Sequence, residues 1–261
     1  MAGCLFCGVA VLVPDALLAG AWTRAEGDGQ IIFTTGRRVA PIGAIASGIA
    51  DDDINTTQIF VEYGLIEGLT IGAALSAELS TTGLGEGAAS VGGFVRKRVW
   101  QGNQGVFSVQ AGYRHPIEDL ISDDFGANNT SSVPEVEMRL LYGHSLWGDW
   151  GSAFFSSEVG YDWRGDEEPD EVRVDLTAGY EPWRCCLTIM SLFTTVTLDG
   201  EEENALKLAP SFAYSLFPSV ARNRKKSNGP VRPATVQFGI NYDLLNPNDG
   251  LGVQLSIWRR F

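Results

Sequence analysis

The last eleven residues of the chain read Leu251-Gly252-Val253-Gln254-Leu255-Ser256-Ile257-Trp258-Arg259-Arg260-Phe261. Apolar side chains occupy every second position from Leu251 to Ile257. Because successive side chains of a strand point to opposite faces, this alternation predicts a β-strand with one apolar face. A strand of about ten residues with this pattern is typical of a transmembrane β-barrel. The alternative is an ordinary β-sandwich strand that ends in Phe.

The same two-residue alternation recurs upstream, with turn residues between the runs. It predicts an all-β chain that folds as a single closed antiparallel transmembrane β-barrel of about 12 strands, connected as an up-and-down meander. The expected strands cover residues 30–38, 59–65, 69–79, 91–99, 107–113, 136–142, 155–163, 172–180, 186–198, 206–216, 236–242 and 251–261.

The predicted connections fall into two classes, as the short and long loops of outer-membrane barrels do. Short turns are expected at 67–68, 101–105, 147–151 and 182–183, and longer, acidic loops at 41–57, 117–133 and 165–171. One long basic segment, residues 218–233, falls on the side of the short turns. Aromatic residues gather at strand ends, where amphipathic rings suit lipid headgroups; they are Trp100, Trp147, Trp150, Trp183, Tyr113, Tyr142, Tyr161, Tyr180, Tyr214 and Tyr242.

The first 21 residues differ in character from the rest. An apolar run from Cys4 to Val13 is followed by Ala19-Gly20-Ala21, small residues that suit a signal-peptidase site. We therefore predict a cleaved signal peptide at 1–21 and a barrel at 22–261. No Lys or Arg precedes the run, which a start codon assigned too far downstream would explain; a buried core helix is the alternative reading.

Charged side chains occupy the parity opposite to the apolar one, so the alternation places them in the lumen. Two outcomes are open: the charges interlock as ion pairs that fill the barrel, or they line a hydrated passage. The predicted lumen-lining residues are Glu62, Glu78, Arg96, Arg98, Arg114, Glu137, Arg139, Glu158, Asp162, Arg173, Asp175 and Lys207.

Composition excludes several classes of partner. The formal net charge of -13 argues against nucleic acid, which needs a basic surface. The two His and four Cys show no metal-ligand spacing, so we expect neither a metal nor a cofactor. The acidic runs 51–53 and 166–170 are expected to be solvated or to bridge lipopolysaccharide, with divalent cation binding as the alternative.

A terminal strand ending in Phe261 resembles the last strand of Gram-negative outer-membrane barrel proteins. That resemblance implies residence in the bacterial outer membrane, contact with its lipid and lipopolysaccharide, and recognition of Phe261 by the barrel-insertion machinery. The stretch from Gly20-Ala21-Trp22-Thr23 to Gly29-Gln30 is similar to outer-membrane transporters of the aromatic-degradation type, over this stretch and the overall pattern only.

Tyr142-Gly143-His144-Ser145 superficially resembles the His and Ser of outer-membrane phospholipase A. That family separates the two residues by one position, whereas here they are adjacent and point to opposite faces. We therefore expect no enzymatic activity. The leading hypothesis is a porin-like channel or transporter for a small solute. The alternatives are a non-conducting structural or assembly barrel of an envelope or polysaccharide-export system and, third, a lipid hydrolase.

Overall fold

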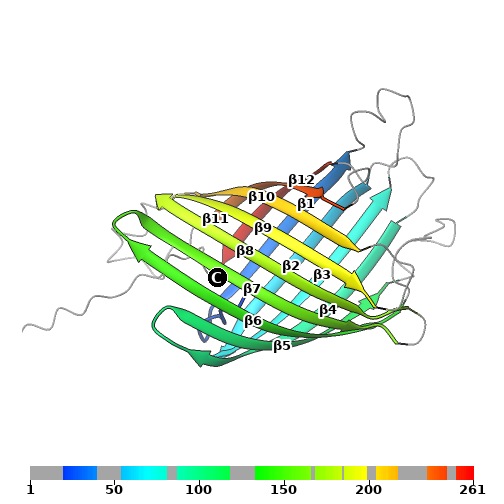
Figure 1. The fold of residues 1–261 in the computed structure, drawn as a ribbon, viewed down its shortest axis with the longest axis horizontal. Coiled ribbons are helices and arrows are strands. Elements are labelled where there is room, and N and C mark those ends of the chain that lie inside the picture. The colour runs from blue at the N-terminus through cyan, green and yellow to red at the C-terminus, as the bar shows by residue number, and fades with distance from the viewer. Residues whose placement is uncertain are drawn as a thin grey trace, which may run out of the picture.

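In the computed structural model, twelve antiparallel strands form all the regular structure of the described residues (Figure 1). The structure describes residues 20–39, 54–80, 87–117, 133–165, 168–183, 185–198, 204–216, 234–245 and 251–261. Within these ranges no helix is long and apolar enough to cross a membrane. The strands are β1 (Gly29–Val39), β2 (Ile54–Ile66), β3 (Leu69–Ser80), β4 (Gly87–Gln101), β5 (Gly105–Pro116), β6 (Glu135–Gly148), β7 (Gly151–Trp163), β8 (Glu171–Trp183), β9 (Cys186–Thr197), β10 (Ala205–Ser215), β11 (Ala234–Asp243) and β12 (Leu251–Arg260).

The strands pair in chain order and the first pairs with the last, so the sheet closes on itself. β1 aligns with β12 from Gln30 opposite Arg260 to Val39 opposite Leu251. Beyond this ladder, the backbones of Gly29 and Phe261 exchange two hydrogen bonds of 2.9 and 3.0 Å. Closure leaves no unpaired sheet edge, as a strand structure in lipid requires. The predicted twelve-stranded meander is confirmed.

The two ends of the barrel differ in the length of their connections. At one end, which we call the short-turn end, β2–β3, β4–β5, β6–β7 and β8–β9 are joined by two or three residues, and only β10–β11 has a long connection, residues 216–233. The turn predicted at 182–183 lies slightly later, because β8 continues through Trp183. The other end, the long-loop end, joins β1 to β2 across residues 40–53 and β5 to β6 across 117–134.

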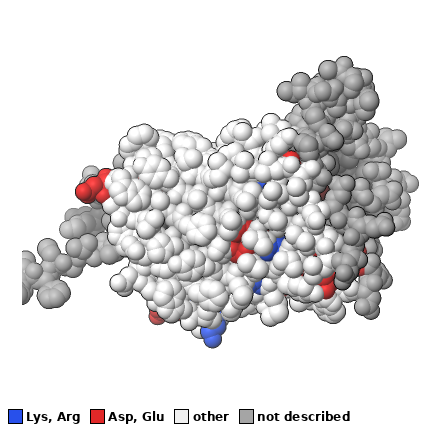
Figure 2. Space-filling model, viewed as in Figure 1, with Lys and Arg blue, Asp and Glu red and all other residues white. Residues whose placement is uncertain are grey.

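The outer face of the barrel is apolar along its height. One side of it is covered predominantly by uncharged atoms (Figure 2). A barrel in lipid must pair its backbone hydrogen-bonding groups within the sheet and present apolar side chains to the lipid, and this surface meets the second requirement. The exposed apolar side chains include Phe33, Ile59, Val95, Leu140, Val159, Phe238 and Leu255.

Aromatic side chains mark the rims of this apolar face. Trp100, Trp147, Trp150 and Trp183 are exposed at the short-turn end, and Tyr113, Tyr161, Trp163 and Tyr242 at the long-loop end. Rings in such positions suit the level of the lipid headgroups. Two other tryptophans, Trp22 and Trp258, are partly buried and pack on apolar clusters of the lumen instead.

Candidate functional site

The lumen holds the polar chemistry of this chain. Residues directly opposite one another on antiparallel strands share a face. Glu62 lies opposite Gly72, and Gly72 lies opposite Phe94, so these three residues are on the same face of the sheet. This is the inner face, and all twelve residues predicted from the alternation fall on it. That they line a passage for solute stays a prediction.

Residues 20–28, which we call the N-terminal segment, lie inside the barrel at its short-turn end. Arg24 and Glu62 form an ion pair in which both side chains are 3% exposed. Arg24 also donates its backbone N–H to Thr70 Oγ1 at 2.7 Å, and its guanidinium to Gln30. Arg96 completes this short-turn group, 3.6 Å from Glu62. The segment is therefore fixed to β1, β2 and β3 by buried polar contacts.

Trp22 fixes the same segment to the opposite wall. Its ring meets Phe154 edge-on, with ring centroids 6.1 Å apart, and it packs on the buried cluster of Phe154, Leu187, Ile189 and Ala213. The neighbouring Ala21 is fully buried against Val106 and Leu141. Its carbonyl oxygen accepts a 2.5 Å hydrogen bond from Ser108. The segment thus crosses the lumen and packs on strands from both sides.

Glycines on the inner wall provide the space that the segment occupies. A Cβ on Gly64 would overlap the carbonyl oxygen of Ala25. A Cβ on Gly143 would come within 2.6 Å of the Trp22 indole. Only glycine lets the wall approach the segment this closely at both positions.

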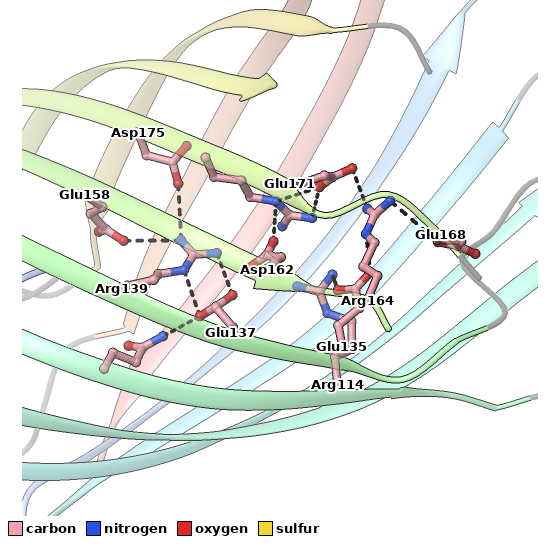
Figure 3. Close-up of polar contacts among 12 residues, drawn as sticks. Arg114, Glu135, Glu137, Arg139, Glu158, Asp162, Arg164, Glu168, Glu171 and Asp175 are labelled. Atoms are coloured by element: carbon pink, nitrogen blue, oxygen red, sulfur yellow. Dashed lines mark hydrogen bonds and ion pairs between the residues drawn. The ribbon is translucent and has the colours of Figure 1, made fainter. Parts of the chain in front are cut away.

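Farther up the lumen, a middle group surrounds Arg139 (Figure 3). Its guanidinium lies 2.7 Å from Glu137, 3.4 Å from Glu158 and 3.3 Å from Asp175. Gln110 donates to Glu137 at 2.9 Å and accepts from Arg96 at 3.0 Å, which joins the middle group to the short-turn group. Three carboxylates therefore share one guanidinium, an excess of negative charge.

A long-loop group lies beyond the middle group (Figure 3). Arg164 contacts Glu171 at 2.5 Å and Glu135 at 3.4 Å. Arg173 contacts Asp162 at 2.7 Å and Glu171 at 2.9 Å. The remaining members are Glu168, 3.5 Å from Arg164, and Arg114, 3.0 Å from Glu135. The three groups follow the lumen wall from β2 to β8, with Arg24 of the N-terminal segment at the short-turn end.

The inner face also carries hydroxyl and amide groups that bond across neighbouring strands. These hydrogen bonds join Thr34 with Ser256, Ser76 with Ser90, Thr177 with Ser191, and Gln237 with Ser211.

Exposure changes along the lumen. Side chains of the short-turn group are at most 8% exposed, whereas Glu158 and Asp175 are 20% and 19% exposed. In the long-loop group Arg114 is 41% exposed, while Glu135 and Asp162 are buried. The N-terminal segment and the apolar cluster around Trp22 fill the short-turn half. Several side chains farther up remain in contact with water.

Sequence reasoning missed the apolar part of this arrangement. Phe154 and Leu141 share the parity of Glu158 and Arg139, so the alternation does place them inside. Nothing in the alternation shows that Trp22 and Arg24 join them, because the segment before β1 has no strand period. The partners of the segment are distant in sequence: Arg24 and Glu62 are 38 residues apart, and Ala21 and Ser108 are 87 apart.

The two side chains of the hydrolase hypothesis lie on different faces. His144 pairs with Phe155 on the outer face, and its Nδ1 lies 3.2 Å from the Tyr142 hydroxyl. Ser145 is buried on the inner face, where it pairs with Phe154. A nucleophile and its base must be within hydrogen-bond reach, so this pair does not form a nucleophilic site.

The predicted acidic run at 51–53, most of the predicted loop 117–133, positions 166–167 and the basic segment 218–233 fall outside the described residues. Among the residues that the structure does describe, no cluster of His, Cys, Asp or Glu is arranged to hold a metal ion.

No protein-family model and no curated protein sequence matches this chain. Many solved structures are similar in fold, among them the following two. The COG4313 outer membrane channel from Pseudomonas putida F1 aligns with a TM-score of 0.57 and 11% identity, over 92% of this chain and 97% of that one. The KdgM porin in complex with disordered oligogalacturonate aligns with a TM-score of 0.51 and 6% identity, over 89% and 98%. The chain therefore has the fold of bacterial outer-membrane β-barrels, with the lipid-facing surface of such a barrel.

Proposed function

We propose that the protein is an outer-membrane channel for small solutes. The observation that carries this proposal is the contrast between the two faces of the sheet: apolar side chains outside, and partly exposed charged groups inside a closed barrel. Water-accessible charges along a lumen are the feature by which channels select solutes. The acidic external loops and a cleaved signal peptide belong to the same proposal. Because Ala21 is buried in the lumen, the proposal has the peptide end before Gly20 and not at the predicted residue 21.

In this proposal the short turns face the periplasm and the long loops face the outside, following the general asymmetry of such barrels. The N-terminal segment then closes the periplasmic half, and the outer half is an open vestibule. A solute enters the vestibule from outside and passes only when the segment leaves its position between β2 and β7. The apolar belt contacts lipid and lipopolysaccharide, and Phe261, 52% exposed at the periplasmic end, is available to the insertion machinery.

The charge of the vestibule favours cations over anions. The middle and long-loop groups together contain four guanidinium groups and seven carboxylates. A lumen lined by excess carboxylate concentrates cations and repels anions.

Planar-bilayer recordings under a KCl gradient test this function. We expect channel openings whose reversal potential shows a preference for potassium over chloride. A double change, Glu158→Gln with Asp175→Asn, is expected to reduce that preference, whereas Glu67→Gln at the rim leaves it unchanged. A preference for chloride in the wild type would exclude the assignment of selectivity, and the absence of openings under all conditions would exclude the channel.

The packed periplasmic half also favours a second candidate, a non-conducting structural barrel. In that case the N-terminal segment is a permanent part of the core, held by the Arg24–Glu62 pair and the Trp22 cluster. Channel recordings on a protein without the segment separate the two candidates. A structural barrel that lacks part of its core is expected to be defective and to gain no regular channel openings.

A further inference from the structure

Two inner-face side chains of the vestibule have no part in the ion-pair groups. Lys207 on β10 makes no hydrogen bond or ion pair with the part of the chain that the structure describes. Phe193 on β9 is 41% exposed, although its neighbours on the same face, Ile189 and Ser191, are buried. Within the described residues, this ammonium and this aromatic ring both lack the partner that such groups usually have in a lumen.

The register brings these two side chains together with a carboxylate. Phe193 lies directly opposite Asp175 on β8 and directly opposite Lys207 on β10. Neighbouring strands are about 4.8 Å apart, so Asp175 and Lys207 project from points about 10 Å apart, with the ring between them. An acid, an aromatic ring and a base therefore form one row across three strands.

At the acidic end of this row there are more carboxylates than the single guanidinium of Arg139 can neutralise. Asp175 and its neighbour Glu158 reach the same Arg139 nitrogen at 3.3 and 3.4 Å, and Glu137 takes the shorter contact. A ligand ammonium at this end would relieve the excess negative charge. At the other end, Asp243 lies opposite Lys207 but accepts backbone N–H groups of Leu206 and Leu245. No ion pair joins Asp243 to Lys207 among the described residues, so Lys207 is available for a ligand carboxylate.

We propose that Asp175, Phe193 and Lys207 form a binding site for a zwitterionic solute of the size of a short peptide. The ligand ammonium meets Asp175, its carboxylate meets Lys207, and an apolar side chain between them packs on the Phe193 ring. An extended chain spans about 3.5 Å per residue, so two or three residues match the row. The inference rests on the proposed function, because it names the class of solute that the channel admits.

The tripeptide alanyl-phenylalanyl-alanine is a suitable probe, because its two charged ends flank a ring. Two capped forms serve as controls on the wild type: the N-acetylated peptide lacks the ammonium, and the C-amidated peptide lacks the carboxylate. Calorimetric titration of the detergent-solubilised barrel should show each capped form binding about tenfold more weakly, as expected for the loss of a charge-assisted contact. Equal affinity for the free and capped peptides would overturn the site.

Lys207→Gln tests the assignment of the carboxylate end. This change should weaken the free peptide about tenfold and leave the C-amidated peptide unaffected, since that peptide has no carboxylate to lose. Lys97→Gln, on the outer face of β4, is the matched control and should alter neither affinity. If Lys207→Gln weakens both peptides equally, the variant reports a structural change and the assignment is wrong.

The site and the channel can fail separately. Peptide binding that depends on Lys207 in a barrel without channel openings would refute the channel and keep the site. If the protein forms channel openings but binds the free and the capped peptides with equal affinity, the site is refuted and the channel is kept.

Discussion

Glu62 is the residue on which the position of the N-terminal segment depends most. Its carboxylate is 3% exposed and lies between the guanidinium groups of Arg24 and Arg96. Removal of one member of a buried pair leaves the other charge without compensation, which costs far more than the loss of an exposed pair. Arg24 belongs to the segment and Arg96 to the wall, so Glu62 connects the two.

Glu62→Gln is therefore expected to lower the free energy of unfolding by about 3–5 kcal/mol. The measurement is urea unfolding in phospholipid vesicles, with tryptophan fluorescence as the readout. Glu67→Gln is the matched control: Glu67 is 88% exposed in its pair with Arg98, and such pairs contribute about 0–1 kcal/mol. Equal effects of the two changes would show that Glu62 does not hold the segment.

Asp170 has a separate role at the connection between β7 and β8. Its carboxylate accepts hydrogen bonds from the Tyr161 hydroxyl and, at 3.0 Å, from the Arg164 backbone N–H. These bonds, with the Tyr161 hydroxyl as the largest cause, hold the pKa of Asp170 below its ordinary value. A lowered pKa in the folded state means that the stabilisation is present above the ordinary pKa and is lost as the pH falls through the lowered one.

The chemical shift of the Arg164 amide proton reports this titration directly. We expect its midpoint to lie below about 3.9, the ordinary pKa of Asp. Tyr161→Phe removes the largest cause and should move the midpoint upward, with little change in the strands. A midpoint at or above the ordinary value in the wild type would contradict the hydrogen-bonding scheme.

At the scale of elements, the N-terminal segment and β2 fit together through Gly64. The Gly64 carbonyl oxygen accepts from the Gly27 N–H and its own N–H donates to the Asp28 carbonyl oxygen, both at 2.9 Å. Because backbone atoms of Ala25 occupy the space of a Cβ at Gly64, a larger residue cannot be accommodated by a side-chain movement. The segment itself must move.

Gly64→Ala should therefore loosen the segment without unfolding the barrel. We expect faster amide hydrogen exchange in residues 20–28, measured by mass spectrometry, and unchanged exchange in the strands. Gly93→Ala is the control, because a Cβ at Gly93 meets its nearest neighbour, the Gly72 carbonyl oxygen, at an ordinary 3.5 Å. Identical exchange in the two variants would mean that contact with β2 does not hold the segment.

The strands and the inner face could be predicted from the alternation alone, because the period of two is local and fixes the face of every residue. Arg139 and Glu158 were placed in the lumen in this way. Their partners required the register, which depends on how neighbouring strands align. The segment before β1 was unpredictable for a different reason: Trp22 and Arg24 are held by contacts across the barrel, and such contacts leave no periodic signal.

For the whole molecule, a barrel of this kind must present its outer face to lipid and its inner face to water. Val159 lies in the middle of β7 on the outer face and is 48% exposed. Arginine at the bilayer midplane of a barrel costs about 2–4 kcal/mol. Val159→Arg should lower the free energy of unfolding in vesicles by this amount, whereas Ser76→Arg, on the inner face of β3, should cost less. A larger loss of unfolding free energy for Ser76→Arg than for Val159→Arg would show that the assignment of the lipid-facing side is wrong.

In the proposed channel, the N-terminal segment closes a lumen that otherwise conducts. Single-channel recordings in planar bilayers can compare the conductance of the wild type with that of a variant lacking residues 20–26. We predict brief, rare openings for the wild type and long-lived openings of larger conductance for the variant. The same conductance in both proteins, or none in either, would show that the N-terminal segment does not close a conducting lumen.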